Sequence, residues 1–585
     1  MYQLYYQPEG IWVGDIMPYG KEGQFYVYHQ RDTRNPGPFG EPFGWALATT
    51  KDFVDYKDYG ESLKRGTDEE ADQFIYAGSV FETEAGFHAF YTGYNREFLK
   101  AGKTSQTLLH ATSKDGITWE KSKEALEIPP QEGYDKRNWR DPFVLWDEER
   151  EEYLLILGAR KGEDKRKQTG RLVHFTSKDL KKWEFKGDFW APGIYTMFEM
   201  PEIFKMGDWW YLVFSEYSEG NKIHYRRSKN LYGPWEAPFD DAFDGRAYYA
   251  GRTAFDGDRR FLFGWVPTRI DNDDKNAYLW GGTFVPHEVF QKEDGTLGVK
   301  PVDQMMEAFD GWKDLFNPCM KTIDTKEETL LCEDTGSIAA FKTTVKFEEG
   351  TKEFSIRFYK DEETEVSYEY RFFVEENKVV FNKCPNYPWY QCFNIGLERP
   401  IKLEADKEYE ICLIIDQDIS TLYINGTALN ARLCDHPGNG LALTVTDGTL
   451  EAKNTKIATK RERAYAMLIN LIEDYNVRLL STKVYWENLK ERERYKKFWD
   501  KFKEINNIKE IDFVEYIKRK EILFIKNDMK EIEKSKKDFS KLLKYYKRKL
   551  VDYGAIREIK NSYSSEGEYT GSIRKIARKV AKNVA

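Results

Sequence analysis

The sequence lacks the features of a membrane-bound or secreted protein. No run of 18 apolar residues occurs in its 585 residues, which argues against a membrane-spanning helix. The N-terminal stretch MYQLYYQPEG has no basic segment followed by an apolar one, so no signal peptide is expected. Its six cysteines include no C-x-x-C pair, which argues against zinc. We therefore expect reduced thiols in a cytoplasmic protein.

Proline and glycine are scarce in the last part of the chain, and its charge differs from the rest. Residues 461–585 contain no proline and three glycines, with 32 Lys and Arg against 20 Asp and Glu. This excess of 12 positive charges, in a chain of net charge −9, leaves −21 on the residues before 461. Within residues 461–585, apolar residues recur every three or four positions, which predicts a basic α-helical region over 461–585.

Three roles are open for this basic region. It can serve as a packing or oligomerisation appendage, as a module that touches nucleic acid or an acidic partner, or as an extension with no part in the chemistry. Apart from this region, we expect no nucleic-acid partner and no membrane partner. The sequence does not define the oligomeric state.

A turn motif recurs four times in the first half of the chain. TTKDFVDY starts at Thr49, TSKDGITW at Thr112, TSKDLKKW at Thr176 and RSKNLYGPW at Arg227. The first three copies start 63 and 64 residues apart. Repetition at a nearly fixed period indicates an architecture of repeated structural units.

Five segments share a second pattern, in which a short apolar strand, a charged or glycine-containing turn and an aromatic-rich strand follow one another. This pattern is typical of β-hairpins. The segments are GDIMPYGKEGQFYVYHQ, AGSVFETEAGFHAFYTGY, RDPFVLWDEEREEYLLILGAR, EMPEIFKMGDWWYLVFSEYS and AGRTAFDGDRRFLFGWV. Five small antiparallel sheets repeated around an axis make a five-bladed β-propeller, which we predict for residues 1–310. An array of β-sandwiches is the alternative.

Residues 320–458 alternate apolar and polar positions in segments such as IAAFKTTVKF, EFSIRFYK and YEICLIIDQD. Alternation of this kind between turns predicts a β-sandwich domain. The predicted fold class is therefore all-β, with a propeller, a sandwich and an additional helical C-terminal region.

Three of the five hairpins begin with a carboxylate, namely Asp15, Asp141 and Glu199. The other two begin with Gly78-Ser79 and Gly251-Arg252. Because the innermost strands of a propeller face a common axis, these acids should converge, and their mutual repulsion should raise the pKa of at least one. A protonated carboxyl beside ionised ones is the arrangement that glycoside hydrolysis requires.

These segments resemble glycoside hydrolase family 32, the β-fructosidases, over residues 8–455. WVGDIMPYG resembles the family's W-M-N-D-P-N-G, WRDPF keeps its R-D-P, and FEMPEIF resembles its W-E-C-P-D-L-F. The resemblance implies a propeller followed by a sandwich. It also implies retaining hydrolysis of terminal β-fructofuranosidic bonds in sucrose, fructo-oligosaccharides or fructans, with no cofactor and no metal.

The resemblance also implies roles for individual residues. Asp15 takes the position of the nucleophile, Asp141 that of the transition-state stabiliser and Glu199 that of the acid/base. Substrate-binding positions fall on Arg140, Gln30, Trp45 and Ser79. Three residues depart from the family pattern: Gly14 stands in place of Asn, Phe198 in place of Trp and Met200 in place of Cys.

Other interpretations of the same residues stay open. Asp15 and Asp141 can start turns, Trp45 can be core packing, and Glu202 is a second candidate for the acid. The chain can also be an inverting propeller glycosidase for another sugar such as an arabinoside, or a sugar-binding propeller without catalysis. Loss of the asparagine at Gly14 motivates the arabinoside alternative.

Overall fold

The computed structural model describes residues 4–122, 128–162, 164, 166–309, 311–386 and 394–459. Within these ranges the regular structure is almost all β, with a short helix α1 (Asp303–Glu307) and a 3-10 turn η1 (Ile270–Asn272). Neither of these helical segments is long or apolar enough to cross a membrane. The predicted helical region 461–585 lies outside the described residues.

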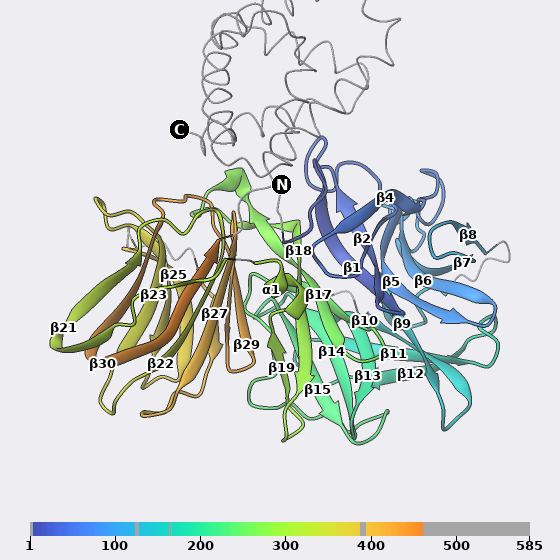
Figure 1. Ribbon diagram of the computed structural model, residues 1–585. Coiled ribbons are helices and arrows are strands. Elements are labelled where there is room, and N and C mark those ends of the chain that lie inside the picture. Colours follow the sequence, from blue (N-terminus) through green and yellow to red (C-terminus); the bar gives the residue numbers. More distant parts are fainter. Residues whose placement is uncertain are drawn as a thin grey trace, which may run out of the picture. The chain divides into compact units, whose positions relative to one another are not determined.

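Strands β1–β19 form the five blades of a propeller, which confirms the predicted fold class (Figure 1). Blade I contains β1 (Trp12–Lys21), β2 (Gln24–Asp32), β3 (Trp45–Thr50) and β4 (Tyr56–Leu63). Blade II contains β5 (Phe74–Thr83), β6 (Gly86–Tyr94), β7 (Gln106–Ser113) and β8 (Trp119–Lys121). Blade III contains β9 (Tyr134–Asp147), β10 (Glu152–Lys161), β11 (Gly170–Ser177) and β12 (Glu184–Trp190). Blade IV contains β13 (Glu199–Met206), β14 (Trp209–Glu216) and β15 (Lys222–Ser228). Blade V contains β16 (Tyr249–Phe255), β17 (Arg260–Arg269), β18 (Tyr278–Gln291) and β19 (Leu297–Lys300).

The first strand of each blade lies at the centre of the propeller. Strand β1 contacts β5 and β16, β9 contacts β5 and β13, and β13 contacts β16. These contacts close a ring of five strands. Blades I and V are also joined where β1 pairs with β18, at Val13 and Gly282. Residues far apart in sequence therefore meet around one axis, as the hairpin repeat predicts.

Every central strand carries a β-bulge near its start. The register shifts between Val13 and Ile16 in β1, between Tyr76 and Gly78 in β5, between Arg140 and Phe143 in β9, between Glu199 and Glu202 in β13, and between Tyr249 and Arg252 in β16. A bulge re-aims side chains and often lies beside an active site. Positive φ angles at Asp141 (63°), Met200 (52°) and Ala250 (54°) mark three of these bulges.

The repeated Ser/Thr-Lys-Asp motif closes a turn between the outer strands of a blade. In blade II, Asp115 Oδ1 accepts from the backbone N–H groups of Ile117 and Thr118, both at 2.8 Å, and Ser113 Oγ accepts from Gly116 N–H. The copies at Asp52 and Asp179 make the equivalent bonds. The motif recurs because Asp side chains stabilise such turns by bonding nearby backbone donors.

Strands β20–β30 form a β-sandwich, the second group of strands in Figure 1. They are β20 (Lys313–Asp314), β21 (Cys319–Cys332), β22 (Ile338–Lys346), β23 (Glu353–Lys360), β24 (Ser367–Phe373), β25 (Lys378–Cys384), β26 (Glu398–Pro400), β27 (Tyr409–Asp416), β28 (Ile419–Ile424), β29 (Thr427–Arg432) and β30 (Gly440–Thr459). Strand β30 joins the two layers: residues 440–446 pair with β23 and residues 451–459 with β22. It changes layer near Asp447, whose φ is 48°.

Buried polar side chains of the sandwich bind blade V and the segment that leads into it. Arg432, 2% exposed, donates to the carbonyls of Val266 and Pro267 at 2.8 and 2.9 Å. Asn430 donates to Asp244 at 2.6 Å. Because these bonds satisfy polar groups that burial would otherwise leave without water, they fix the sandwich against the propeller.

Candidate active site

The three carboxylates that the sequence singles out meet around the propeller axis at the bulges. Glu199 is the last paired residue before the bulge of β13, Asp141 is the first bulge residue of β9, and Asp15 is the second bulge residue of β1. Their charges interact, since Asp141 and Glu199 both act on the pKa of Asp15. The side chain of Asp141 is 3% exposed and that of Glu199 is 20% exposed, so Glu199 is nearer to solvent than Asp141.

Glu199 accepts hydrogen bonds on both of its carboxylate oxygens. Arg140 Nη2 and Nε donate to Oε1 at 2.7 and 3.1 Å. The Tyr249 hydroxyl donates to Oε2 at 2.6 Å. Arg140, Glu199 and Tyr249 each stand directly before the bulge of their strand. Their side chains therefore form a continuous row of hydrogen bonds across blades III, IV and V.

Asp15 lies against aromatic and amide groups. The indole N–H of Trp265 donates to Oδ1 at 3.2 Å. The Gln30 amide, in the orientation that satisfies its neighbours, donates to Oδ2 at 3.3 Å and accepts from Ala77 N–H at 2.8 Å. Burial raises the pKa of Asp15 well above its usual range, and the charges of Asp141 and Glu199 add to the rise.

Asp141 is held by its backbone and side chain together. Its N–H donates to Thr92 Oγ1 at 2.9 Å, and its Oδ2 accepts from Met200 N–H at 3.1 Å. Burial raises the pKa of Asp141, whereas the Arg140 guanidinium, 4.0 Å away, acts to lower it. Burial, with the charges of the neighbouring acids added to it, therefore raises the pKa of two of the three carboxyls, in the direction that the sequence predicts.

Four further residues were predicted to bind substrate, and the structure places two of them in the site. Arg140 and Gln30 contact Glu199 and Asp15 as described above. The prediction for Trp45 is wrong: the indole is 0% exposed and donates to the Tyr76 carbonyl at 3.0 Å, so it cannot stack on a sugar. The prediction that Ser79 binds substrate is also wrong, because this residue is buried. Its hydroxyl accepts a hydrogen bond from Val144 N–H at 3.2 Å and so joins blades II and III.

Sequence reasoning missed three aromatic residues of the site, Trp265, Tyr249 and Tyr76. Tyr249 and Tyr76 precede the bulges of β16 and β5, as Glu199 does in β13. Both begin a Tyr-Ala-Gly tripeptide, and this repetition is the sequence signal that would have found them. Trp265 lies on the second strand of its blade, and its approach to Asp15 has no signal in the repeat.

Glu202, the second candidate for the acid, has a different role. It is 2% exposed, and its two oxygens accept from the backbone N–H and the hydroxyl of Thr253, both at 2.5 Å. Arg260 lies 3.6 Å away. Glu202 therefore joins blades IV and V beneath the site. In the described part of the chain, no group of three or more His, Cys, Asp or Glu side chains is arranged to hold a metal ion.

Trp280 leaves no room for a side chain at position 14. A Cβ atom at position 14 would lie 2.0 Å from Cη2 of Trp280, although the backbone of Gly14 is not in the left-handed region. Trp280 in turn packs on Phe39, with ring centroids 4.6 Å apart, and edge-to-face on Trp265 at 5.7 Å. An indole thus occupies the space beside the nucleophile candidate that a larger residue 14 would need.

Gly14→Asn is expected to destabilise the protein by about 2 kcal/mol, because the new side chain overpacks against Trp280. When Gly14→Asn is introduced into the Trp280→Ala variant, it should cost little stability, because the indole that it clashes with is gone. Thermal unfolding of the four proteins measures the coupling. Additive effects of the two substitutions would contradict the assignment.

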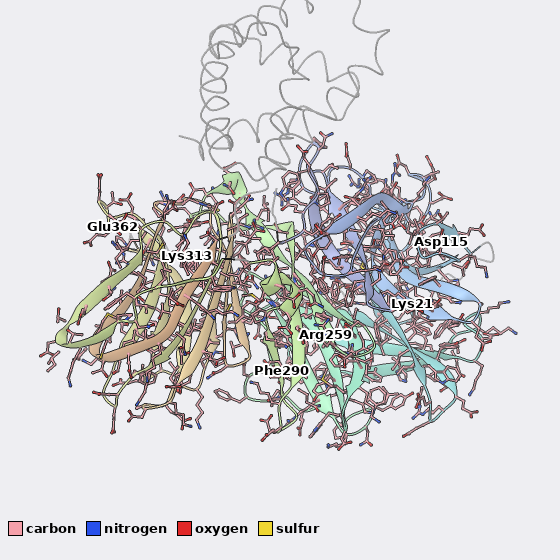
Figure 2. The ribbon with its side chains drawn as sticks, in the orientation of Figure 1. Lys21, Asp115, Arg259, Phe290, Lys313 and Glu362 are labelled. Atoms are coloured by element: carbon pink, nitrogen blue, oxygen red, sulfur yellow. The ribbon has the colours of Figure 1, made fainter. Side chains whose placement is uncertain are left out.

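A surface hollow of about 340 Å³ between blades I and II is separate from this site. Lys21, Glu82, Lys114 and Asp115 line it, and Figure 2 labels two of them. Lys21 is six residues beyond Asp15 on β1, which corresponds to about 20 Å along a strand. The hollow therefore has no part in the chemistry of the carboxylates.

The sequence is similar to those of known proteins. Residues 5–301 match the profile of the glycosyl hydrolases family 32 N-terminal domain. The chain is 26% identical to a sucrose-6-phosphate hydrolase of Staphylococcus xylosus over 384 residues, covering 62% of this chain and 70% of that protein. It is 23% identical to a levanase of Bacillus subtilis (strain 168) over 514 residues, covering 78% and 69%.

The fold is similar to that of fructan 1-exohydrolase IIa from Cichorium intybus. The TM-score is 0.64 at 17% identity, and the similarity covers 79% of this chain and 97% of that one. A five-bladed propeller with three converging carboxylates and a following sandwich defines a glycosidase. The chain belongs to glycosyl hydrolases family 32.

Proposed function

We propose that this chain is a β-fructosidase in which Asp15 is the nucleophile, Glu199 the acid/base and Asp141 the stabiliser of the transition state. The observation that carries the proposal is the convergence of these carboxylates at the bulges of three central strands, with Arg140 linking two of them. Retaining hydrolysis needs one carboxylate that attacks and one acid that protonates the leaving oxygen. A third carboxylate can bind sugar hydroxyls and stabilise the positive charge that develops on the ring.

The reaction runs in two displacements. Asp15 attacks the anomeric carbon of the fructosyl unit while Glu199 gives its proton to the glycosidic oxygen, and the leaving alcohol departs. Glu199 then takes a proton from water, which attacks the fructosyl-Asp15 ester and releases fructose. The Trp265 indole and the Gln30 amide orient Asp15, and their hydrogen bonds favour its ionised form.

Substrate must displace a donor from Glu199 for the first step. Arg140 and Tyr249 occupy both oxygens of Glu199 in the structure, and a glycosidic oxygen has to take one of these places. Tyr217, which is 44% exposed, interacts with Arg140, so we expect the guanidinium to lie close enough to solvent to bind substrate hydroxyls once it leaves Glu199. Arg140 thereby couples sugar binding to the release of Glu199.

The substrate class is a carbohydrate with a terminal fructofuranosyl unit. The relatives named above include a sucrose-6-phosphate hydrolase and a levanase, and both names describe substrates with such units. The family match favours this function over the arabinoside alternative. A cytoplasmic location is part of the proposal, and its support is that five cysteines of the described part are free thiols.

The proposal is tested by a sugar panel combined with product stereochemistry. Sucrose, its 6-phosphate, inulin, levan and arabinan are each incubated with the full chain in the presence of methanol. We expect fructose release from at least one of the first four, and a methyl β-fructofuranoside as the trapped product in the NMR spectrum. Methyl glycosides do not interconvert, so an α product would refute retention, and activity on arabinan alone would refute the substrate class.

A further inference from the structure

Arg252, on β16, crosses the propeller axis beneath the three carboxylates. Its guanidinium is buried, with the residue 2% exposed. Nη1 donates to the carbonyl of Gly78 on β5 at 2.6 Å, and Nη2 donates to the carbonyl of Asp141 on β9 at 2.9 Å. One side chain thus ties three of the five central strands together at the level just below the site.

The bonds of Arg252 hold a strained point of the backbone. Asp141 has a φ of 63°, a conformation that costs free energy in a residue other than glycine. The Arg252 bond to its carbonyl, the Thr92 bond to its N–H and the Met200 bond to its side chain fix this conformation from three sides. Asp141 can therefore present its carboxylate to the site only while these contacts persist.

No carboxylate is within hydrogen-bond distance of the Arg252 guanidinium in the described part of the chain, where its bonds all go to carbonyl oxygens. A buried cation without a contacting anion is expensive unless nearby charges offset it. The carboxylates that act on its charge are Asp141, Glu202 and Asp15. Since Arg260 already pairs with Glu202, the positive charge of Arg252 is left for Asp141 and Asp15.

The balance of charges in the site explains why a buried cation is useful at this position. The acid step requires Glu199 to carry a proton while Asp15 and Asp141 are ionised, which leaves two negative charges. Arg140 and Arg252 supply two positive charges, so the buried site is neutral overall. Without Arg252 the site carries an excess negative charge, and an additional proton would bind a carboxylate.

We propose that Arg252 is a positioning residue, which holds Asp141 in its strained conformation and supplies the positive charge that lets Asp15 and Asp141 be ionised at the same time. This inference rests on the proposed function for its charge count and for its kinetic readout. An arginine is suited to this position because the two terminal nitrogens of its planar guanidinium can donate to two carbonyls at once, whereas a lysine carries its charge and its donors on a single nitrogen.

The other titratable groups around the carboxylates do not replace this charge. Apart from Asp15, Asp141 and Arg252, the charged groups of the central strands at and just below the site are Arg140 on β9 with Glu199 and Glu202 on β13. Burial raises the pKa of Tyr76 and of Tyr249, so both phenols stay neutral. Trp265 contributes a neutral N–H.

The test compares Arg252→Met, Arg252→Lys and the matched control Arg260→Met. Arg260 is a partly buried arginine of the same blade, with a side chain 13% exposed, and it pairs with Glu202. In the pH profile of kcat/KM, Arg252→Met should move the acid limb upward by about one pH unit, because loss of a nearby positive charge makes carboxylates harder to ionise. It should also lower kcat at least 10-fold.

Arg252→Lys should lower kcat while the acid limb stays near its original pH, because the charge remains and the second carbonyl bond is lost. Arg260→Met should leave the acid limb in place whatever it does to stability. An unchanged acid limb in Arg252→Met, or an equal shift in Arg260→Met, would overturn the proposal.

A second measurement needs no activity and so separates this inference from the proposed function. The loss of Tm caused by Arg252→Met should be larger at pH 7.5 than at pH 5.5, because repulsion between the carboxylates grows as they ionise. In an Asp15→Asn/Asp141→Asn background this difference between the two pH values should vanish. A loss of Tm independent of pH in the parent background would assign Arg252 to packing alone and refute the charge role.

Discussion

Asp15→Asn is expected to lower kcat by at least about 10⁴-fold, the order of magnitude that follows removal of a catalytic nucleophile. An amide cannot form the fructosyl ester, while the Trp265 and Gln30 contacts to position 15 keep a side chain of the same shape in place. Initial rates on the best sugar of the panel measure the loss. A variant with more than a tenth of the parent activity would refute Asp15 as the nucleophile.

The same variant should not lose stability at neutral pH. The folded state raises the pKa of Asp15, so the unfolded chain binds fewer protons than the folded chain over the interval between the two pKa values. Stability then falls as pH rises through this interval. Removal of the ionisable group removes this cost, so Asp15→Asn should unfold at the same temperature as the parent or higher at pH 7.5, and the gain should shrink as pH is lowered.

Azide distinguishes a lost nucleophile from a damaged site. In Asp15→Ala, azide can occupy the space of the carboxylate and attack the anomeric carbon, which gives a fructosyl azide of inverted configuration. In a variant that is inactive because its fold is disturbed, azide should restore nothing. The configuration of the azide product is read by NMR.

Glu199→Gln is expected to lower kcat on sucrose-type substrates by about 10²- to 10⁴-fold, the usual contribution of an acid/base catalyst. The amide can still hydrogen bond to Arg140 or Tyr249, which the carboxylate contacts at 2.7 and 2.6 Å, but it cannot transfer a proton. Initial rates across the sugar panel measure the effect. A loss of less than tenfold on every substrate would refute the assignment.

An activated fructoside separates the acid role from the base role of Glu199. An aryl fructoside with an acidic phenol as leaving group needs little protonation, so the first displacement should stay fast in Glu199→Ala and the fructosyl-enzyme should accumulate. Azide should then release a fructosyl azide of retained configuration, opposite to that from Asp15→Ala. Glu202→Gln is the control, because Glu202 binds Thr253 and not the site; a matching azide product from this variant would contradict the roles.

Local sequence patterns predicted the hairpins and the three acids because they depend on residues close together in the chain. Alternation, turn residues and the period of the repeat follow from backbone geometry, and Asp15, Asp141 and Glu199 were found near the starts of three hairpins, although their positions relative to the bulge differ. The errors at Trp45 and Ser79 have one cause. Motif matching identifies a residue type but not the direction of its side chain, and both side chains point into packed regions between strands.

The sequence by itself determined the all-β architecture, the five-fold repeat and the set of converging carboxylates, since each follows from periodicity and from the placement of acids within the period. Only the tertiary structure decided which neighbours these acids have. Trp265 against Asp15, Tyr249 against Glu199 and Arg252 beneath Asp141 join positions 250, 50 and 111 residues apart. Such pairs depend on closure of the ring and on the bulge in each central strand, and no local pattern encodes either.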